Sequence, residues 1–454
     1  MPKPYFASAI LSRVLRRPCQ AGIKLAFVGL CALAINPVAQ AQVVNGVDYA
    51  DRAHVDHTFD MAGTDIFGQR FPSESLTIVD PVTGVKVTAL TTSRHSSSKI
   101  YQDHPNWTAD GKYIVFSSNR NTAAGGNVTF ASNRDARSGR QFYAISMDTH
   151  EIVQVTTGAN TKDLLLGNKK NVAFYIRDNQ VIEFSLGKLL ADSERKKVQD
   201  VTGYEKVVAT LPDALKPGGM CLDINDNRIF FSTKEGENRS AIYSVEFDTN
   251  KTTKLAEVPF RTGHFQANPF VSGEMMYCWE TGGDSPQRMW LLNVDKQGNV
   301  QNRPIYKEKD DEWVTHEVFA APDYVLFNVM GHLDRLRKNP TGIKLLNTRT
   351  NEARLLGQAK ESGGYWHSAG TKDLKWAVGD SFDGNIYRLN IETGEATLLT
   401  TGHRPTTKSP FSSQAHAHQS ISPDGKWVLF NSSLLTDSDL MLVPLHPDKS
   451  TAQR

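Results

Sequence analysis

The chain has 454 residues, of which 39% are hydrophobic and 22% are charged, as in a folded water-soluble protein, which excludes a disordered chain. That length suffices for two or three ordinary domains or for one large repeat architecture. The formal net charge of +2 becomes −3 once the basic leader described next is removed, and a near-neutral chain argues against nucleic acid as a partner.

The first 41 residues form a predicted secretory signal peptide. Five basic residues and no acidic residue precede the apolar run 25–35, and Ala39-Gln40-Ala41 is a small-x-small cleavage site. The apolar run is too short to span a bilayer, and no later stretch is apolar enough to do so. We therefore expect a periplasmic or secreted protein that has no membrane contact after cleavage.

The next segment, residues 42–74, shows no clear periodicity, and we interpret it as an N-terminal extension. The folded domain is predicted to occupy residues 75–448. Two cysteines, Cys221 and Cys278, lie in this domain. Two thiols do not make a disulfide scaffold, so we favour free, buried thiols over a disulfide between them.

From residue 75 onward, a turn followed by an apolar run recurs along the chain. The runs are marked by Tyr113, Val172, Ile229, Met275, Val325, Trp376 and Trp427, at spacings of 46 to 59 residues. Most repeats continue with an alternating strand, a polar turn and another strand, which predicts a four-stranded antiparallel meander. Seven such units predict an all-β, seven-bladed β-propeller. The hairpin 76–88 is expected to add outer strands to the last blade and close the ring.

Five histidines keep a similar position within this repeat, six to nine residues ahead of the turn. They are His104, His264, His316, His367 and His418. Because the first strand of each propeller blade lines the central channel, these side chains are expected to converge at one mouth of it. A repeated structural histidine that bonds a neighbouring turn is the alternative. Three or more converging imidazoles would form a metal site or an acid–base site.

A pair of histidines, His416 and His418, stands just ahead of the turn Pro423-Asp424-Gly425. We expect this stretch to be one strand entering a hairpin, with both imidazoles on the same face. Two imidazoles so placed can bind one first-row metal ion, whereas a polar pair in a surface hairpin is the alternative. On the neighbouring blades, Arg288 is expected to reach the same rim as His316, and Glu317 to point to the opposite face.

The ordered set of Arg288, His316, His367 and the His416-x-His418 pair resembles the oligogalacturonide lyases, a family of seven-bladed β-propeller lyases. The resemblance is good over residues 264–430 and looser over 76–447. It implies β-elimination on short α-1,4-linked galacturonates, which releases an unsaturated 4-deoxy uronate. An oligouronide is thus the implied partner.

The resemblance also implies a site in which three histidines and a glutamine hold a Mn²⁺-type ion, with Ca²⁺ and Zn²⁺ as alternatives. Carried over by position, the histidine ligands are His367, His416 and His418, and the general base is His316 with Arg288 beside it. A cation that neutralises the uronate carboxylate lowers the barrier to removing the C5 proton, and a histidine is suited to accept it. The predicted substrate-binding residues are His264, Tyr101 and His104.

The chain departs from the family pattern in two respects. The family's glutamine stands three residues before the histidine pair, where this chain has Ser413. Gln414, one position later, is the predicted fourth ligand. Familiar members of the family are cytoplasmic, whereas the leader here predicts a periplasmic enzyme, acting on a different or longer uronate.

Two alternative functions stay open on the sequence alone. The first is the same elimination on another uronate polysaccharide, such as ulvan or a rhamnogalacturonan fragment. The second is a non-enzymatic periplasmic propeller, similar to TolB, that binds a partner protein and no transition metal. The sequence does not fix the oligomeric state.

Overall fold

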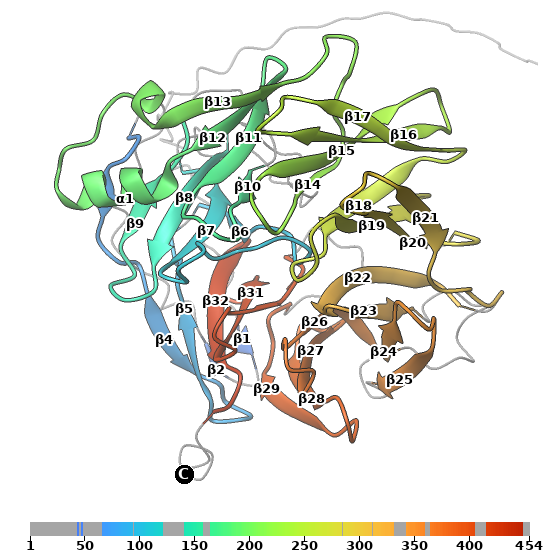
Figure 1. Ribbon diagram of the computed structural model, residues 1–454. Helices are drawn as coiled ribbons and strands as arrows, with labels where there is room; N and C mark the ends of the chain where they lie inside the picture. Colours follow the sequence, from blue (N-terminus) through green and yellow to red (C-terminus); the bar gives the residue numbers. More distant parts are fainter. Residues whose placement is uncertain are drawn as a thin grey trace, which may run out of the picture. The chain divides into compact units, whose positions relative to one another are not determined.

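Seven antiparallel sheets follow one another in a ring in the computed structural model (Figure 1). The structure describes residues 66–93, 95–120, 140–157, 164–283, 285–310, 312–330, 342–358, 364–404 and 415–447. It also describes the backbone of two short paired strands, β1 (Val43–Val44) and β2 (Val47–Asp48). Of the seven sheets in these ranges, five have four strands and two have five. The predicted seven-bladed β-propeller is therefore confirmed.

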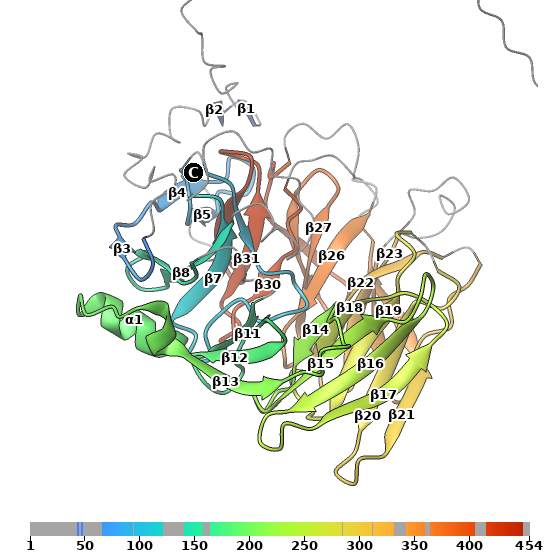
Figure 2. The same ribbon diagram turned by 90° about the horizontal axis from the view of Figure 1, so that it is seen from above.

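Each blade begins with its innermost strand and proceeds outward along the chain. The first blade contains β6 (Ser97–Lys99), β7 (Tyr113–Ser118), β8 (Gln141–Ser146) and β9 (Ile152–Gln154). The second contains β10 (Leu165–Leu166), β11 (Ala173–Arg177), β12 (Gln180–Phe184) and β13 (Glu205–Thr210). Between its last two strands lie α1 (Leu186–Glu194), at the periphery in Figure 2, and the 3₁₀ helix η3 (Val201–Tyr204). The third contains β14 (Met220–Leu222), β15 (Arg228–Lys234), β16 (Ser240–Glu246) and β17 (Thr252–Val258).

The remaining blades repeat the same meander. The fourth contains β18 (Thr262–Ala267), β19 (Glu274–Trp279), β20 (Met289–Val294) and β21 (Val300–Pro304). The fifth contains β22 (Val314–Ala321), β23 (Tyr324–Val329), β24 (Gly342–Asn347) and β25 (Ala353–Gly357). The sixth contains β26 (Tyr365–Gly370), β27 (Trp376–Ser381), β28 (Ile386–Asn390) and β29 (Ala396–Thr400). The seventh begins with β30 (Ser420–Ile421), β31 (Trp427–Ser432) and β32 (Asp439–Pro444).

Apolar side chains fill the spaces between neighbouring blades. In β15, Ile229 and Phe231 pack in the cluster shared with the second blade, whereas Phe230 packs in the cluster shared with the fourth. Successive strand residues point to opposite faces, and both faces of these blades are covered. This explains why the second strand of each repeat reads as a continuous apolar run rather than an alternating one. In the described residues, each of the seven clusters joins two adjacent blades.

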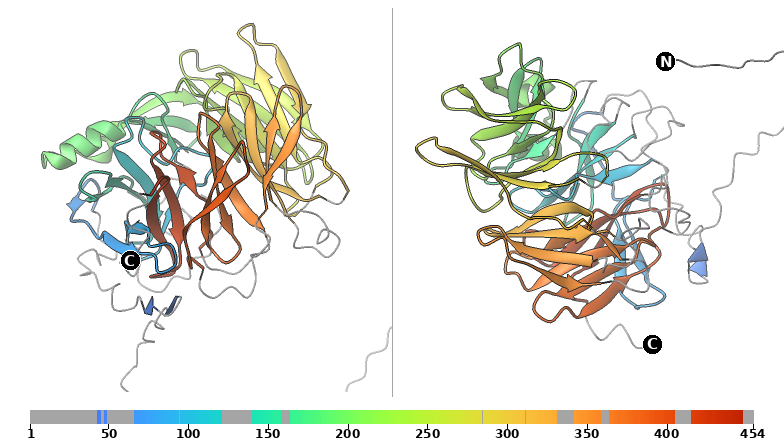
Figure 3. Two further views of the ribbon diagram at one scale, coloured as in Figure 1. Left: turned by 90° about the horizontal axis from the view of Figure 1, so that it is seen from below. Right: turned by 90° about the vertical axis from the view of Figure 1, so that its right-hand side faces the viewer.

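Strands from near the start of the chain close the ring. The hairpin β4 (Leu76–Val79) and β5 (Lys86–Ala89) pairs with β32 of the seventh blade through Met441 and Leu442 (Figures 1 and 3). This is the closure predicted for the hairpin 76–88. A further strand, β3 (Arg70–Phe71), pairs with β9 at the outer edge of the first blade. The propeller therefore includes residues ahead of position 75.

A buried ion pair, Arg120 with Glu74, joins the seventh and first blades at this closure. Both side chains are almost fully buried, and an Nη2 of Arg120 lies 2.7 Å from an Oε of Glu74. The same carboxylate accepts the backbone N–H groups of Thr92 and Ser93. Burial alone would raise the pKa of Glu74, but the Arg120 charge and these hydrogen bonds hold that pKa below its usual value.

Replacing Glu74 with glutamine is expected to destabilise the protein by about 3 kcal/mol, because it leaves the buried Arg120 charge without its partner. Urea unfolding measures this loss. Since the pKa of Glu74 is lowered in the folded state, the contribution is present at neutral pH and fades as the pH falls below about 4. Glu257→Gln, in a more exposed ion pair with Arg239, is the control and should change stability by less than about 1 kcal/mol. Equal losses in the two variants would contradict the prediction.

Two further observations concern the sequence-based expectations. Cys221 and Cys278 are free and buried, as favoured from the sequence. Among the described residues, no helix has the length and apolar character needed to cross a membrane.

Candidate functional site

Histidines gather where the innermost strands of several blades begin. His264, His316 and His418 have positive φ values of 49°, 56° and 44°. The strand pairing shifts register on either side of the first two, between Gly263 and Gln266 and between Thr315 and Val318. A non-glycine residue in this conformation costs about 1–3 kcal/mol, and such bulges re-aim side chains next to functional sites.

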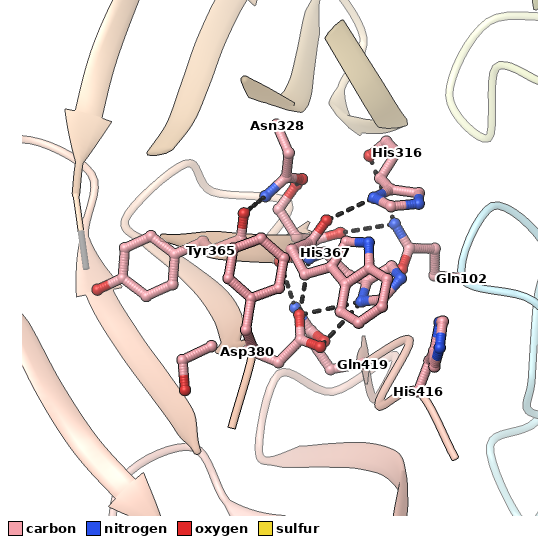
Figure 4. A network of polar contacts seen from close by, with 12 residues as sticks. Gln102, His316, Asn328, Tyr365, His367, Asp380, His416 and Gln419 are labelled. Atoms are coloured by element: carbon pink, nitrogen blue, oxygen red, sulfur yellow. Dashed lines mark hydrogen bonds and ion pairs between the residues drawn. The ribbon is translucent and has the colours of Figure 1, made fainter. Parts of the chain in front are cut away.

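His367 is held in one orientation by a buried carboxylate. Its Nδ1 lies 2.9 Å from Oδ2 of Asp380, and its backbone N–H donates to Oδ1 of the same residue at 2.7 Å (Figure 4). Because Nδ1–H donates to Asp380, the other ring nitrogen, Nε2, presents a lone pair. This Nε2 is buried and has no hydrogen-bond partner among the described residues. Burial raises the pKa of Asp380 to about 7, so a nearby cation would favour its charged form.

The predicted ligands His367, His416 and His418 come together. One nitrogen from each lies within 4.8 Å of the others, and the rings of His367 and His418 are 4.3 Å apart between centroids. Burial, with smaller contributions from neighbouring charges, lowers the pKa of His367 and of His418 well below the usual value. Neutral imidazole is the form that binds metal ions, so the three residues fit a transition metal.

The local structure of the histidine pair differs from the predicted strand. Residues 415–419 lie outside any strand, and β30 begins only at Ser420. His416 and His418 therefore reach the same place through the positive φ of His418 rather than through regular strand alternation. Ser413 and Gln414, the position of the family's glutamine and the predicted fourth ligand, lie outside the described residues.

His316, the predicted general base, lies next to His367. The two rings are 4.2 Å apart between centroids, and Nδ1 of His316 bonds the carbonyl oxygen of Trp366 (Figure 4). A carbonyl only accepts, so Nδ1 carries the proton and Nε2 is left as the basic nitrogen. Burial, followed by the charges of His367 and His264, lowers the pKa of His316 well below its usual value.

Arg288 lies between two acidic residues. Its Nε donates to Glu317 at 3.2 Å, and an Nη2 lies 3.9 Å from Glu280. Burial alone would lower the pKa of Arg288, but the neighbouring Cys278, Glu317 and Glu280 raise that pKa, and Arg288 stays charged. Glu317, which was predicted to point to the opposite face from His316, binds the guanidinium of Arg288, and the Arg288 charge contributes to the lowered pKa of His316.

Tyr101 and His264 complete the cluster. The Tyr101 ring lies 4.7 Å from His418 and 5.6 Å from His264 between centroids. His264 lies beside Cys278 and Glu280, a second group whose ligand atoms are within 4.8 Å of one another. Arg288 lies close to this same Glu280, so a cation held there would face a guanidinium. The three histidines are therefore the better candidate site for a cation.

Among the predicted site residues that the structure describes, His104 does not join the cluster. It lies 3.5 Å from Asp103 and lines a cavity of about 650 Å³. This cavity is also lined by the turns that follow the innermost strands, including Gly167, Asp373 and Asp424. The histidine cluster lies where these strands begin, so His104 belongs to the other end of the channel.

Three glutamines hold the backbone of the clustered histidines. Gln419 donates to the carbonyl oxygen of His367 at 2.7 Å, and Gln102 to that of His316 at 3.4 Å (Figure 4). Gln266 donates to the carbonyl oxygen of Glu317 at 2.7 Å. These bonds hold the irregular backbone from other blades, which are adjacent ones for Gln419 and Gln266. The sequence analysis did not predict these glutamines. A signal for two of them was present, because Gln266 stands two residues after His264 and Gln419 stands directly after His418.

Asp380→Asn is expected to weaken metal binding about 10- to 100-fold, because it removes the charge that orients His367 and raises its basicity. Titration calorimetry with Mn²⁺ measures this change. The control is Asp383→Asn, an exposed aspartate in the turn after β27. If both variants bind Mn²⁺ like the unmodified protein, His367 does not depend on Asp380 as argued.

Comparisons with known proteins find solved structures with a similar fold. No protein-family model matches the sequence, and no curated protein matches it. A solved structure of an oligogalacturonate lyase in complex with manganese is 20% identical, with a TM-score of 0.66, and the match covers 86% of this chain and 100% of that one. An oligogalacturonate lyase from Vibrio parahaemolyticus is also 20% identical, with a TM-score of 0.65 and coverage of 85% and 100%. These matches show a shared propeller fold, in agreement with the resemblance noted from the sequence.

Proposed function

We propose that this protein is a metal-assisted β-eliminating lyase that cleaves short α-1,4-linked galacturonates. The observation that carries the proposal is the meeting of His367, His416 and His418 around one point, with the basic nitrogen of His316 beside them. The fold likeness to oligogalacturonate lyases, one of them a manganese complex, supports it. The leader supports location in the periplasm or outside the cell.

The residues present fit a divalent metal ion, and His367, His416 and His418 would hold it. When bound, the ion supplies positive charge that stabilises the carboxylate as negative charge develops next to it. Mn²⁺ is the proposed ion because an oligogalacturonate lyase of similar fold was solved in complex with manganese. Imidazole ligands alone would suit Zn²⁺ as well, so both ions are included in the test below.

The protein's own residues remove the proton, supply a proton to the leaving group and keep a positive charge nearby. In the proposed reaction, Nε2 of His316 takes the proton from C5, the C4–O4 bond breaks, and a C4=C5 double bond forms. The departing oxygen takes up a proton and becomes a hydroxyl group, so nothing is oxidised or reduced. Burial raises the pKa of Tyr101 well above its usual value, so its hydroxyl keeps its proton and is available to the departing oxygen. Arg288, fixed by Glu317, keeps a positive charge near His316.

The direct test is to incubate the protein with di- and trigalacturonate and follow the ultraviolet absorbance of the unsaturated product. The protein is loaded in turn with Mn²⁺, Ca²⁺ and Zn²⁺. Ulvan and rhamnogalacturonan fragments serve as a substrate panel, since the same chemistry acts on other uronates. Absence of product with every metal and every substrate would contradict the proposal. Cell fractionation tests the proposed location.

A further inference from the structure

A lysine in the first blade, Lys99, is buried beside this site, and its ammonium group bonds a backbone carbonyl rather than a carboxylate. Only 5% of the residue is exposed, and its Nζ donates to the carbonyl oxygen of Ile100 at 2.7 Å. Among the described residues it forms no ion pair. A buried ammonium group without a bonded carboxylate is costly, because burial disfavours its charged form.

The backbone of the first blade places Lys99 against the histidine pair. Its backbone N–H donates to Asn431 at 2.9 Å, and the same Asn431 donates to the carbonyl oxygen of His416 at 3.1 Å. Ile100 packs into the core between the first and second blades, so the residues on either side of it face the other way. One of these is Tyr101, which contacts His418.

The Lys99 charge reaches the proposed metal ligands. After burial, which is the larger cause, this charge contributes to lowering the pKa of His367 and of His418. Burial lowers the pKa of Lys99 itself to about 7, while the Asp103 charge opposes that change. The hydrogen bonds through Asn431 and the contact of Tyr101 with His418 place Lys99 beside those imidazoles, where its ammonium group would repel a cation and attract an anion.

The charges around the site do not balance once a divalent ion is added. Arg288 with Glu317 and Glu280 carries a net charge of −1, and Asp380 and Asp103 add two negative charges. A divalent ion, Lys99 and Arg404, whose charge acts on His367, add four positive charges, so one positive charge is left over. A carboxylate from the ligand would restore the balance, which a neutral sugar cannot do.

We propose that Lys99 makes the site selective for acidic sugars by repelling a bare metal ion and binding a ligand carboxylate, so that metal and uronate bind cooperatively. This inference rests on the proposed function, since it assumes an acidic sugar as ligand. By linkage, a uronate that tightens metal binding must have its own affinity raised by the metal by the same factor.

The test compares the protein with Lys99→Met, using calorimetry with Mn²⁺ alone, Mn²⁺ with D-galacturonate, and Mn²⁺ with galactose. Galacturonate has no glycosidic bond to cleave, so the measurement does not depend on turnover. In Lys99→Met we expect Mn²⁺ alone to bind about tenfold more tightly, because a repulsive charge is gone. Galacturonate should bind the Mn²⁺-loaded variant about tenfold more weakly. Galactose should have no effect on either protein.

Matched variants separate a charge effect from a structural one. Lys99→Arg keeps the charge and should retain the cooperative binding, and Lys426→Met, at an exposed turn, should behave as the unmodified protein. Lys99→Gln replaces Lys99→Met if the latter is not folded by near-ultraviolet circular dichroism. Unchanged or weaker Mn²⁺ binding in the neutral variants, or unchanged galacturonate affinity, would overturn the inference. The expected shifts without any lyase activity would overturn the proposed reaction and keep the role of Lys99.

Discussion

His316→Ala is expected to lower kcat for digalacturonate by about 10³-fold, with little change in KM. The variant lacks the nitrogen proposed to remove the C5 proton, and a positioned acid or base contributes about 10²–10⁴-fold. In the unmodified protein, Nδ1 of His316 is bonded to the carbonyl oxygen of Trp366, so Nε2 is the ring nitrogen that can accept the proton.

The pH dependence gives a second readout of the same residue. The proposed base must be unprotonated, and burial with neighbouring charges lowers the pKa of His316 well below 6.5. The acidic limb of the kcat/KM profile is therefore expected below the usual histidine value, and activity should persist at mildly acidic pH. This limb should vanish in His316→Ala. The control is His150→Asn, a histidine in a turn of the first blade with a φ of 56° that asparagine tolerates. Nearly unchanged kcat in His316→Ala would rule this residue out as the base.

His418→Ala is expected to lower the affinity for Mn²⁺ by more than about 100-fold, because it removes a direct ligand, and loss of an outer partner alone costs about 10–100-fold. Lyase activity should be lost at Mn²⁺ concentrations that saturate the unmodified protein. Thermal unfolding provides an independent measurement. Mn²⁺ at 100 times its Kd should stabilise the unmodified protein by about 2.7 kcal/mol and leave the variant almost unchanged.

One result for His418→Ala would contradict the proposed metal site. Full metal binding by this variant would show that the ion is not held by the three histidines. His446→Ala is the matched control, because His446 lies after β32 and lines the cavity at the opposite end of the channel. It should bind Mn²⁺ with unchanged affinity.

The blades were predictable because their second strands are buried on both faces. Runs such as 229–231 and 428–430 are apolar at every position, and the structure packs alternate residues into the clusters on either side. The closing hairpin was predictable for a related reason, since a ring needs partners for its last strand. The pattern does not show where the extension ends: Ile66 is buried in the core and Glu74 is held by Arg120.

The metal ligands were predicted by residue type and order, but their geometry was not. A periodic pattern implies regular strands, whereas His264, His316 and His418 all have positive φ. These conformations depend on bonds from other blades, such as those of Gln266 and Gln102, which no local pattern encodes. Lys99 was missed for the same reason, because its partner Asn431 is far away in sequence. Asp380 lies on the next strand of the same blade as His367, and it was missed because the repeat pattern does not mark a buried carboxylate there.

The placement of the ligands in the last two blades has a consequence for how the protein matures. Synthesis proceeds from the N-terminus, so the ligands His367, His416 and His418 emerge only near its end. The seventh blade also requires the hairpin β4–β5, which must wait for β32 before it has an edge to pair with. An ion held by these three ligands would thus be captured only after the whole polypeptide has arrived and its ends have met. For a protein exported as proposed, the metal supply of the compartment where folding is completed would decide which ion the proposed site takes up.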